Sequence, residues 1–357
     1  MNKAWVDTVK ALLQYVLSDQ MTKGIPSSVF SCFSNVWLQD STSLHLPDAL
    51  IGKYKGNKGR GKSQSVAKLN VIINAFTGFC PVLEWSNFIV AEQSLSPDIL
   101  KIARTGDLVI RDMGYFVMDV FERMIEAKIF FLSRLRYGLC IYDIKSGGKH
   151  DLIKILKGKS FIDLQIICGR EHGLRVRLIA IKLPEAQANE RRRKAKLNKQ
   201  KGINHNKEYY ALLDYCLFIT TVSEDIWSYR QVAEAYRVRW NIEIVFKSWK
   251  SGLQLDKLIP KAITKTERVE SFLYLMMIYI VLFQLSIWVP LKAKMNKIKT
   301  PISILKLTKW ALINPLDWIN NGLSTNMEKE ILYYCRYETR RRNNAQDRLE
   351  TIFKPLS

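Results

Sequence analysis

Residues 228–252 read SYRQVAEAYRVRWNIEIVFKSWKSG, and this stretch is the part of the sequence that is most informative about the fold. Ser228 followed three residues later by Gln231 forms a capping box, which predicts the start of a helix. Gly252 is the residue type that commonly ends one. The stretch therefore predicts a single helix over residues 229–251.

One side of this predicted helix is apolar. At about 100° per residue, five side chains spaced three and four apart fall within an arc of about 80°. Such a stripe predicts a face that is turned toward a protein core. The five residues are Ala235, Val238, Ile242, Val245 and Trp249.

A second face beside this stripe carries polar groups. Tyr236, Arg239, Glu243 and Lys250 fall within an arc of about 60°. A carboxylate flanked by cations suits phosphodiester chemistry, because the acid can hold a metal ion while the cations hold phosphates. Considered by itself, the pattern also fits an ordinary surface in which Arg239 and Glu243 form an i,i+4 ion pair.

Two further side chains of this helix are candidate DNA contacts. Lys247 adds a cation. Trp240 could stack on DNA bases, although a packing role fits it better.

The segments before residue 135 alternate between strand and helix signals, which predicts a mixed α/β sheet. Two of the predicted strands end in an acid, Asp40 and Asp112. The strands are predicted at 36–40, 66–77, 82–90, 108–112 and 128–134, and the helices at 3–19, 97–104 and 117–127.

The chain changes character between residues 138 and 222, where short strand-like runs predict a β-rich insertion. These runs are 139–144, 151–157, 162–168, 174–183 and 215–222. A basic stretch between Pro184 and Gly202 predicts an exposed helix. Its DNA-contacting candidates are Arg191, Arg192 and Arg193, although a basic run is also typical of a merely solvated face. Beyond residue 228 the chain is predicted to be helical nearly to its end.

The charge balance indicates a polyanionic partner. Among 357 residues, 55 are Lys or Arg and 33 are Asp or Glu, for a net charge of +22. Nucleic acid is the partner favoured, because neutralising phosphates releases counterions; an anionic lipid surface is the alternative. The hydrophobic fraction of 48% excludes a wholly disordered chain. Six scattered cysteines without a CxxC pair argue against a zinc site and disulfides, and favour a reducing cytoplasm.

Residues 271–291 are free of charge and long enough to span a membrane. They include Ser271, Gln284 and Ser286, and Pro290 closes the run. A helix buried in a protein core has the same composition, and we expect that alternative and no membrane association.

Three blocks of the sequence resemble one protein family. YRVRWNIEIVFKSWK, residues 236–250, matches Tyr-x2-Arg-x3-Glu-x6-Lys, the Y-R-E-K signature of DDE transposases from bacterial insertion sequences of the insertion-sequence family four type. Asp40-Ser41-Thr42 resembles the end of the strand with the first acid. GDLVIRDMGY at 106–115, followed by FLSR at 131–134, resembles the block of the second acid. The resemblance covers residues 36–285.

The resemblance implies an α/β fold, a ribonuclease-H-like mixed sheet with a β-rich insertion subdomain and a helical C-terminal region. It also implies five segments along the chain. These are a residual N-terminal helical segment (1–35), the first part of the catalytic core (36–137), the insertion with its basic helix (138–222), the core helices carrying Glu243 (223–290) and a basic helical C-terminal region (291–357).

The activity implied is that of a DNA transposase, which cleaves and transfers strands at transposon ends by cut-and-paste transposition. Asp40, Asp112 and Glu243 would together hold two Mg²⁺ ions, for which Mn²⁺ would substitute. Tyr236, Arg239 and Lys250 would position DNA phosphates. The implied partners are double-stranded DNA, as transposon ends and target, and a second copy of the chain. The implied location is the nucleoid in the bacterial cytoplasm.

Several alternatives stay open. Asp107 could replace Asp112, and Asp48 is a weaker rival to Asp40. GNKGRGKS at 56–63 matches a P-loop, but it lacks a preceding buried strand and a following helix, which favours a basic loop whose Lys62 touches DNA. Relatives carry an N-terminal end-binding domain, whereas 39 residues precede Asp40 here. A truncated, catalytically defective remnant that only binds DNA is therefore the second hypothesis.

Overall fold

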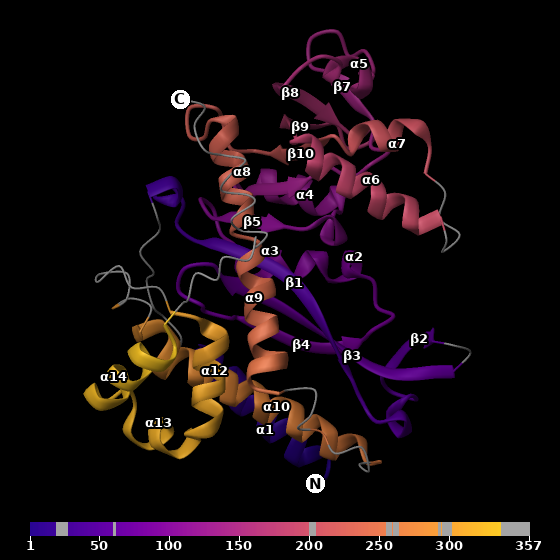
Figure 1. Ribbon diagram of the computed structural model, residues 1–357. Helices are drawn as coiled ribbons and strands as arrows, with labels where there is room; N and C mark the ends of the chain where they lie inside the picture. The colour runs from indigo at the N-terminus through magenta and orange to yellow at the C-terminus, as the bar shows by residue number, and fades with distance from the viewer. Residues whose placement is uncertain are drawn as a thin grey trace. The chain divides into compact units, whose positions relative to one another are not determined.

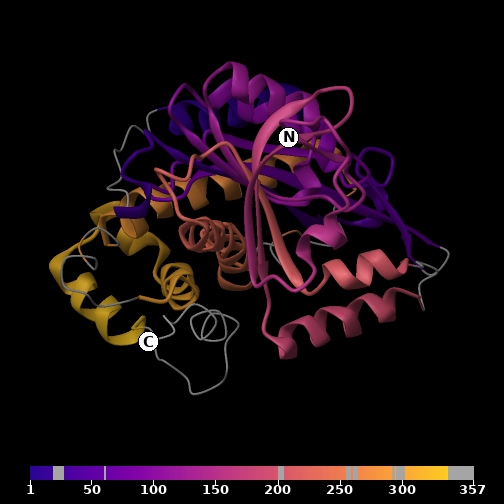
Figure 2. The ribbon, with the colours of Figure 1, turned by 90° about the horizontal axis from the view of Figure 1, so that it is seen from above.

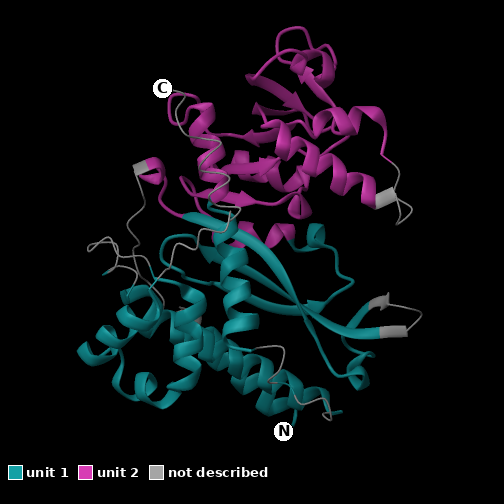
Figure 3. Ribbon diagram, viewed as in Figure 1, with its two compact units in different colours: residues 1–27, 36–95, 238–339 teal, residues 28–35, 96–237, 340–357 magenta. Residues whose placement is uncertain are grey.

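The computed structural model describes residues 1–18, 28–59, 62–199, 205–254, 259, 264–291, 294 and 302–336. The chain forms two compact units, coloured separately in Figure 3. Unit 1 comprises Met1–Ser27, Val36–Leu95 and Val238–Thr339, and unit 2 comprises Ser28–Asn35, Ser96–Arg237 and Arg340–Ser357.

The sheet of unit 1 is antiparallel and is built around the long strand β3 (Lys62–Asn74). Three strands pair with β3, namely β1 (Val36–His45), β2 (Lys55–Gly59) and β4 (Val82–Asn87). The predicted hairpin of residues 66–77 and 82–90 is confirmed by β3 and β4, whose register runs from Ala67 opposite Asn87 to Ile72 opposite Val82.

The P-loop alternative is excluded by this sheet. Gly56–Gly59 lie on β2 and Lys62–Ser63 on β3, with Lys58 paired with Ser63 and Gly59 with Lys62. A phosphate-binding P-loop must lead from a strand into a helix, and here a strand follows instead. The backbone of Lys62 begins β3, while its side chain lies outside the described side chains.

Helices form the rest of unit 1. The predicted N-terminal helix is confirmed as α1 (Lys3–Ser18), and it packs on α10 (Thr266–Phe283). The helix α10 continues into a π-helical turn, η6 (Gln284–Trp288). Three shorter helices gather beyond it, as the yellow part of Figure 1 shows; they are α12 (Ile304–Ile313), α13 (Pro315–Asn321) and α14 (Thr325–Tyr334).

The uncharged segment at residues 271–291 lies within this helical part. In the described part of the chain, Thr266–Leu291 is the one helix long and apolar enough to cross a membrane, and 50% of its most apolar window is buried inside the protein. Phe283, Ile287 and Leu291 share one hydrophobic cluster with Trp310 and Trp318. These contacts favour the interpretation of the segment as a core helix.

Unit 2 has a mixed sheet with the strand order β5-β6-β10-β9-β8-β7. The first two strands are parallel and the remaining pairs are antiparallel. The segment predicted as an insertion therefore extends the sheet of β5 and β6. The strands are β5 (Leu108–Arg111), β6 (Phe130–Arg134), β7 (Ile141–Asp143), β8 (Phe161–Cys168), β9 (Leu174–Lys182) and β10 (Tyr215–Thr220).

The helices of unit 2 include four that the sequence indicated and two that it did not. The expected ones are α3 (Ile99–Ile102), α4 (Met118–Glu126), α6 (Glu185–Lys199) and α8 (Tyr229–Arg237). The unexpected ones are α5 (Leu152–Leu156) and α7 (Lys207–Leu212). The strand predicted at 151–157 is thus wrong. Asp151 caps α5 by accepting a hydrogen bond from Lys154 N at 3.2 Å, and a short apolar run does not by itself distinguish strand from helix.

The helix predicted over residues 229–251 begins as expected. Ser228 N donates to Gln231 Oε1 at 2.9 Å and Gln231 N donates to Ser228 Oγ at 3.4 Å, which confirms the capping box. The helix is not continuous, however. It stops at Arg237, resumes as α9 (Trp240–Lys247) and ends in a π-helical turn, η5 (Ser248–Gly252).

Candidate active site

Asp40 lies on β1, directly opposite Val71 of β3. The prediction that this acid ends its strand is wrong, because β1 continues to His45. The side chain is 17% exposed, and its Oδ1 accepts a hydrogen bond from Ser41 N at 2.8 Å. The other oxygen, Oδ2, faces the guanidinium of Arg239.

Arg239 brings Asp40 and Glu243 together. Its Nη1 lies 3.7 Å from Asp40 Oδ2, and its Nη2 lies 2.8 Å from Glu243 Oε1. The arginine side chain is only 10% exposed, and its guanidinium lies 5.0 Å from the ring of Trp240. Since α9 also contacts β1 directly, two of the three predicted acids lie against a single positive group within unit 1.

Asp112 is the third predicted acid and belongs to unit 2. It follows the last residue of β5 and begins the short 3-10 helix η4 (Met113–Tyr115), but its carboxylate does not cap that turn. Tyr236 Oη donates a hydrogen bond to Asp112 Oδ1 at 3.2 Å. Tyr236 is 7% exposed, and its ring packs against that of Phe218. The phenol thus contacts an acid.

The rival acids have other surroundings. Asp107 is 1% exposed, and its two oxygens accept hydrogen bonds from Asn35 Nδ2 and Arg104 N, each at 2.9 Å. It therefore fixes the turn before β5. Asp48 is exposed at the start of the short 3-10 helix η2 (Asp48–Leu50).

The chemistry of Asp40, Asp112 and Glu243 fits divalent metal ions. Magnesium prefers carboxylate oxygens in proteins, and Asp40 and Glu243 already share one cationic neighbour. Over the residues that the structure describes, no three His, Cys, Asp or Glu side chains form a ready-made metal-binding group. Two of the acids lie in unit 1 and one in unit 2.

The remaining residues of the helical stretch differ in exposure. Trp240 is 48% exposed and Lys247 is exposed, whereas Lys250 is half-buried within η5. A π-turn holds more residues than an α-turn. The break before Trp240 and the π-turn both change the angular positions, so the common face of Tyr236 and Lys250 stays a prediction.

Two of the three candidate arginines on the basic helix α6 make hydrogen bonds or an ion pair inside unit 2. Arg191 donates to Tyr215 O at 3.1 Å and to Cys216 Sγ at 3.2 Å, and Arg192 pairs with Asp214. Arg193 is exposed and pairs with Glu190, an ion pair that lowers the pKa of Glu190 to about 2. Figure 1 and Figure 2 both show α6 beside α7.

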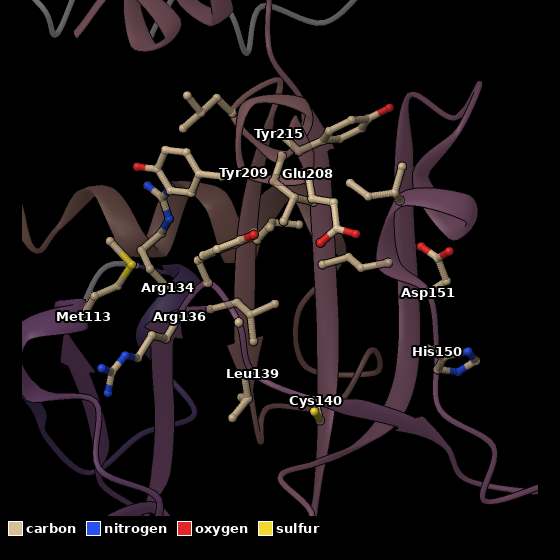
Figure 4. A pocket seen from close by; sticks show the side chains of 18 of the residues that line it. Met113, Arg134, Arg136, Leu139, Cys140, His150, Asp151, Glu208, Tyr209 and Tyr215 are labelled. Atoms are coloured by element: carbon tan, nitrogen blue, oxygen red, sulfur yellow. The ribbon is translucent and has the colours of Figure 1, made fainter. Parts of the chain in front are cut away.

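Unit 2 also holds a cavity of about 470 Å³ next to Met113, the residue that follows Asp112. Figure 4 shows Met113, Arg134 and Tyr209 on one side of it and His150 and Asp151 on the other. Its lining combines leucines with cations and tyrosines, including Leu139, Leu212, Leu217, Arg134, Arg136, Lys149, Tyr137, Tyr209 and Tyr215. This cavity could not be predicted from the sequence, because its walls come from segments far apart in the chain.

Arg111 was also missed. It is fully buried, and burial lowers its pKa to about 9, so it remains charged at neutral pH. The signal was present in the sequence, because a lone arginine ends the otherwise apolar run LVIR at 108–111. Charged residues are rarely buried unless their hydrogen bonds are satisfied.

Comparisons with known proteins give one consistent result. Residues 32–282 match the family described as Transposase DDE domain. The chain is 26% identical over 278 residues to the transposase of insertion sequence element IS231D of Bacillus thuringiensis subsp. finitimus, covering 71% of this chain and 56% of the relative. It is 41% identical over 86 residues to the putative transposase InsL of IS186A of Escherichia coli (strain K12), covering 24% of this chain and 23% of the relative.

The chain thus spans a little over half the length of the IS231D relative. It is also similar to a solved piggyBac transposase in a synaptic complex with hairpin DNA, with a TM-score of 0.43 and 7% identity over 89% of this chain and 62% of that chain.

Proposed function

The chain belongs to the Transposase DDE domain family, and from that membership we propose that it cleaves and transfers DNA strands at the ends of a bacterial insertion sequence. One observation carries the proposal beyond the family match. Asp40 and Glu243 contact one cationic group, and the third acid, Asp112, is held by the tyrosine that stands three residues before the arginine.

We propose that Asp40, Asp112 and Glu243 bind two Mg²⁺ ions, with Mn²⁺ as a substitute. Such ions supply an activated water or 3′-hydroxyl and stabilise the departing oxygen. The carboxylates set where the reacting phosphate lies. Arg239 touches two of the acids, so its guanidinium is positioned to contact that phosphate as well. Tyr236 orients the carboxylate of Asp112.

The DNA surface that we propose consists of exposed or half-buried cations and one exposed ring. Lys247, Lys250 and Trp240 supply these groups in unit 1 and Arg193 supplies one in unit 2, and Lys62 is proposed as a further DNA contact. Arg191 and Arg192 are already bonded within unit 2 and contribute mainly to fastening α6. The proposed partners are double-stranded DNA and a second copy of the chain, in the bacterial cytoplasm at the nucleoid and without a membrane.

The cavity beside Met113 suits a nucleotide displaced from the DNA stack. Its leucines and tyrosines can cover a base, and Arg134 and Arg136 can hold the adjoining phosphates. A 2-aminopurine base at the cleavage site should brighten on binding wild-type protein. This increase should be lost with Leu212→Trp, which fills the cavity. An unchanged signal in this variant would show that the base does not enter there.

Plasmid cleavage tests the proposed activity. The substrate is a supercoiled plasmid that carries the coding sequence's genomic flanks, with Mg²⁺ present. Wild type should nick it, and Asp40→Asn, Asp112→Asn and Glu243→Gln should each lose about a hundredfold or more, because metal-held charge contributes several kcal/mol to the reaction. All four proteins should bind the plasmid similarly.

The possible results separate the two functions considered. Equal nicking by every variant would place the activity elsewhere. Binding without nicking by wild type would support the DNA-binding remnant instead.

A further inference from the structure

Arg111 and Asp112 are chain neighbours with opposite surroundings. Arg111 ends β5 and has 0% of its surface exposed, whereas Asp112 is half-buried and accepts a hydrogen bond from Tyr236. Successive side chains of extended backbone point to opposite sides. The guanidinium of Arg111 therefore lies behind the strand whose end presents the carboxylate of Asp112.

The buried guanidinium of Arg111 donates hydrogen bonds to Ser96, which precedes β5 in the chain, and to Tyr115, which follows it. Its Nη1 donates to Ser96 Oγ at 2.8 Å and to Tyr115 O at 3.4 Å, and its Nη2 donates to Ser96 O at 3.0 Å. Ser96 Oγ in turn donates to Tyr115 O at 2.9 Å. The guanidinium also lies 5.9 Å from the ring of Tyr115 and 5.9 Å from that of Phe121.

These contacts fix the turn that carries Asp112. Tyr115 N donates to Asp112 O at 3.1 Å, which closes the turn that Asp112 begins. Arg111 therefore holds both ends of the turn. Its backbone is joined to Asp112 at the start, and its guanidinium donates to Tyr115 O at the end. Because the carboxylate of Asp112 makes no hydrogen bond to this turn, its direction is set by Tyr236 and by the position of the backbone that carries it.

We propose that Arg111 is a positioning residue for Asp112, and that its buried guanidinium sets the geometry with which this carboxylate binds a metal ion. The inference rests on the proposed function, in which Asp112 is a metal ligand. Residues that support metal ligands from behind commonly change metal affinity about 10- to 100-fold when they are substituted.

Binding of Mn²⁺ to the purified full chain, followed through the electron paramagnetic resonance signal of the free ion, tests this without cleavage. Arg111→Lys keeps the charge but loses the planar fork, and Arg111→Met removes the charge. By electrostatics alone, loss of a nearby positive charge would strengthen cation binding. A positioning role predicts the opposite, with both variants binding Mn²⁺ about tenfold more weakly.

Two further variants control for folding. Arg177 is a second buried arginine of unit 2, bonded to Asp163, Val222 O and Trp227 O. Arg177→Met should lower thermal stability without changing Mn²⁺ affinity. Ser96→Ala retains Arg111 but removes one hydroxyl, so it should fold and weaken Mn²⁺ binding about threefold. If the Arg111 variants do not fold, the Mn²⁺ affinity of Ser96→Ala alone tests the proposal.

Tighter Mn²⁺ binding by Arg111→Met, or wild-type affinity in Ser96→Ala and in every Arg111 variant that folds, overturns the inference. A different result would locate the error in the proposed function. If Asp112→Asn binds as much Mn²⁺ as wild type does, then Asp112 is not a metal ligand. The inference then fails together with the proposed site.

Discussion

At the scale of single residues, Tyr236 has two possible roles that the structure helps to separate. The resemblance to the Y-R-E-K signature implies a contact with a DNA phosphate. In the structure its hydroxyl donates to Asp112 Oδ1 at 3.2 Å, and its ring is packed in unit 2. A phenol held in this way is suited to orienting a carboxylate.

We expect Tyr236→Phe to raise the Mg²⁺ concentration for half-maximal nicking about fivefold, because one hydrogen bond to the acid is worth about 1 kcal/mol. DNA affinity should be unchanged in a gel-shift titration. The matched control is Tyr229→Phe on the same helix, whose ring stacks on Phe161 at 4.1 Å. A loss of DNA affinity with an unchanged Mg²⁺ requirement would favour the phosphate role.

At the scale of elements, η5 is held against α12 by a close approach at Gly252. A Cβ built at Gly252 would lie 1.9 Å from Thr308 Oγ1 and 2.7 Å from Thr308 Cβ. Only glycine fits this contact. The glycine that the sequence indicated as a helix end is therefore also the residue that lets the turn carrying Lys250 pack on its neighbour.

Gly252→Ala should destabilise the protein by about 1–3 kcal/mol, the usual cost of overpacking. Gly52→Ala is its control, because nothing lies within 4 Å of a Cβ at Gly52, and it should stay within about 0.5 kcal/mol of wild type. Urea unfolding followed by circular dichroism measures both. Equal midpoints for the two variants would show that the contact between η5 and α12 relaxes easily.

The elements also show what the sequence could and could not predict. Alternating and β-branched runs predicted the strands β1, β3, β4, β5 and β6, and the capping box at Ser228 predicted the start of α8. The break at Val238 and Arg239 was not predictable, since both residues continue a regular helical pattern. It depends on packing that periodicity does not record. The helix α5 was missed because its five residues are too short to show a period.

At the scale of the whole molecule, the three acids are distributed over two units. Sequence order and resemblance predicted Asp40, Asp112 and Glu243 as the catalytic acids, but the partner of each carboxylate came from the structure. Arg239 faces Asp40 and Glu243 in unit 1, and Tyr236 faces Asp112 in unit 2. Two of these contacts join residues 124 and 199 positions apart, the third lies across one helical turn, and no local pattern specifies them together.

The central claim is that these three carboxylates share one metal site, and metal-directed cleavage of the protein tests it most directly. Fe²⁺ with ascorbate and peroxide generates radicals that cut the backbone beside a bound ion. We predict cuts near residues 40, 112 and 243 that excess Mg²⁺ suppresses and that Asp112→Asn abolishes together. Cuts near 40 and 243 alone, persisting in Asp112→Asn, would contradict the account.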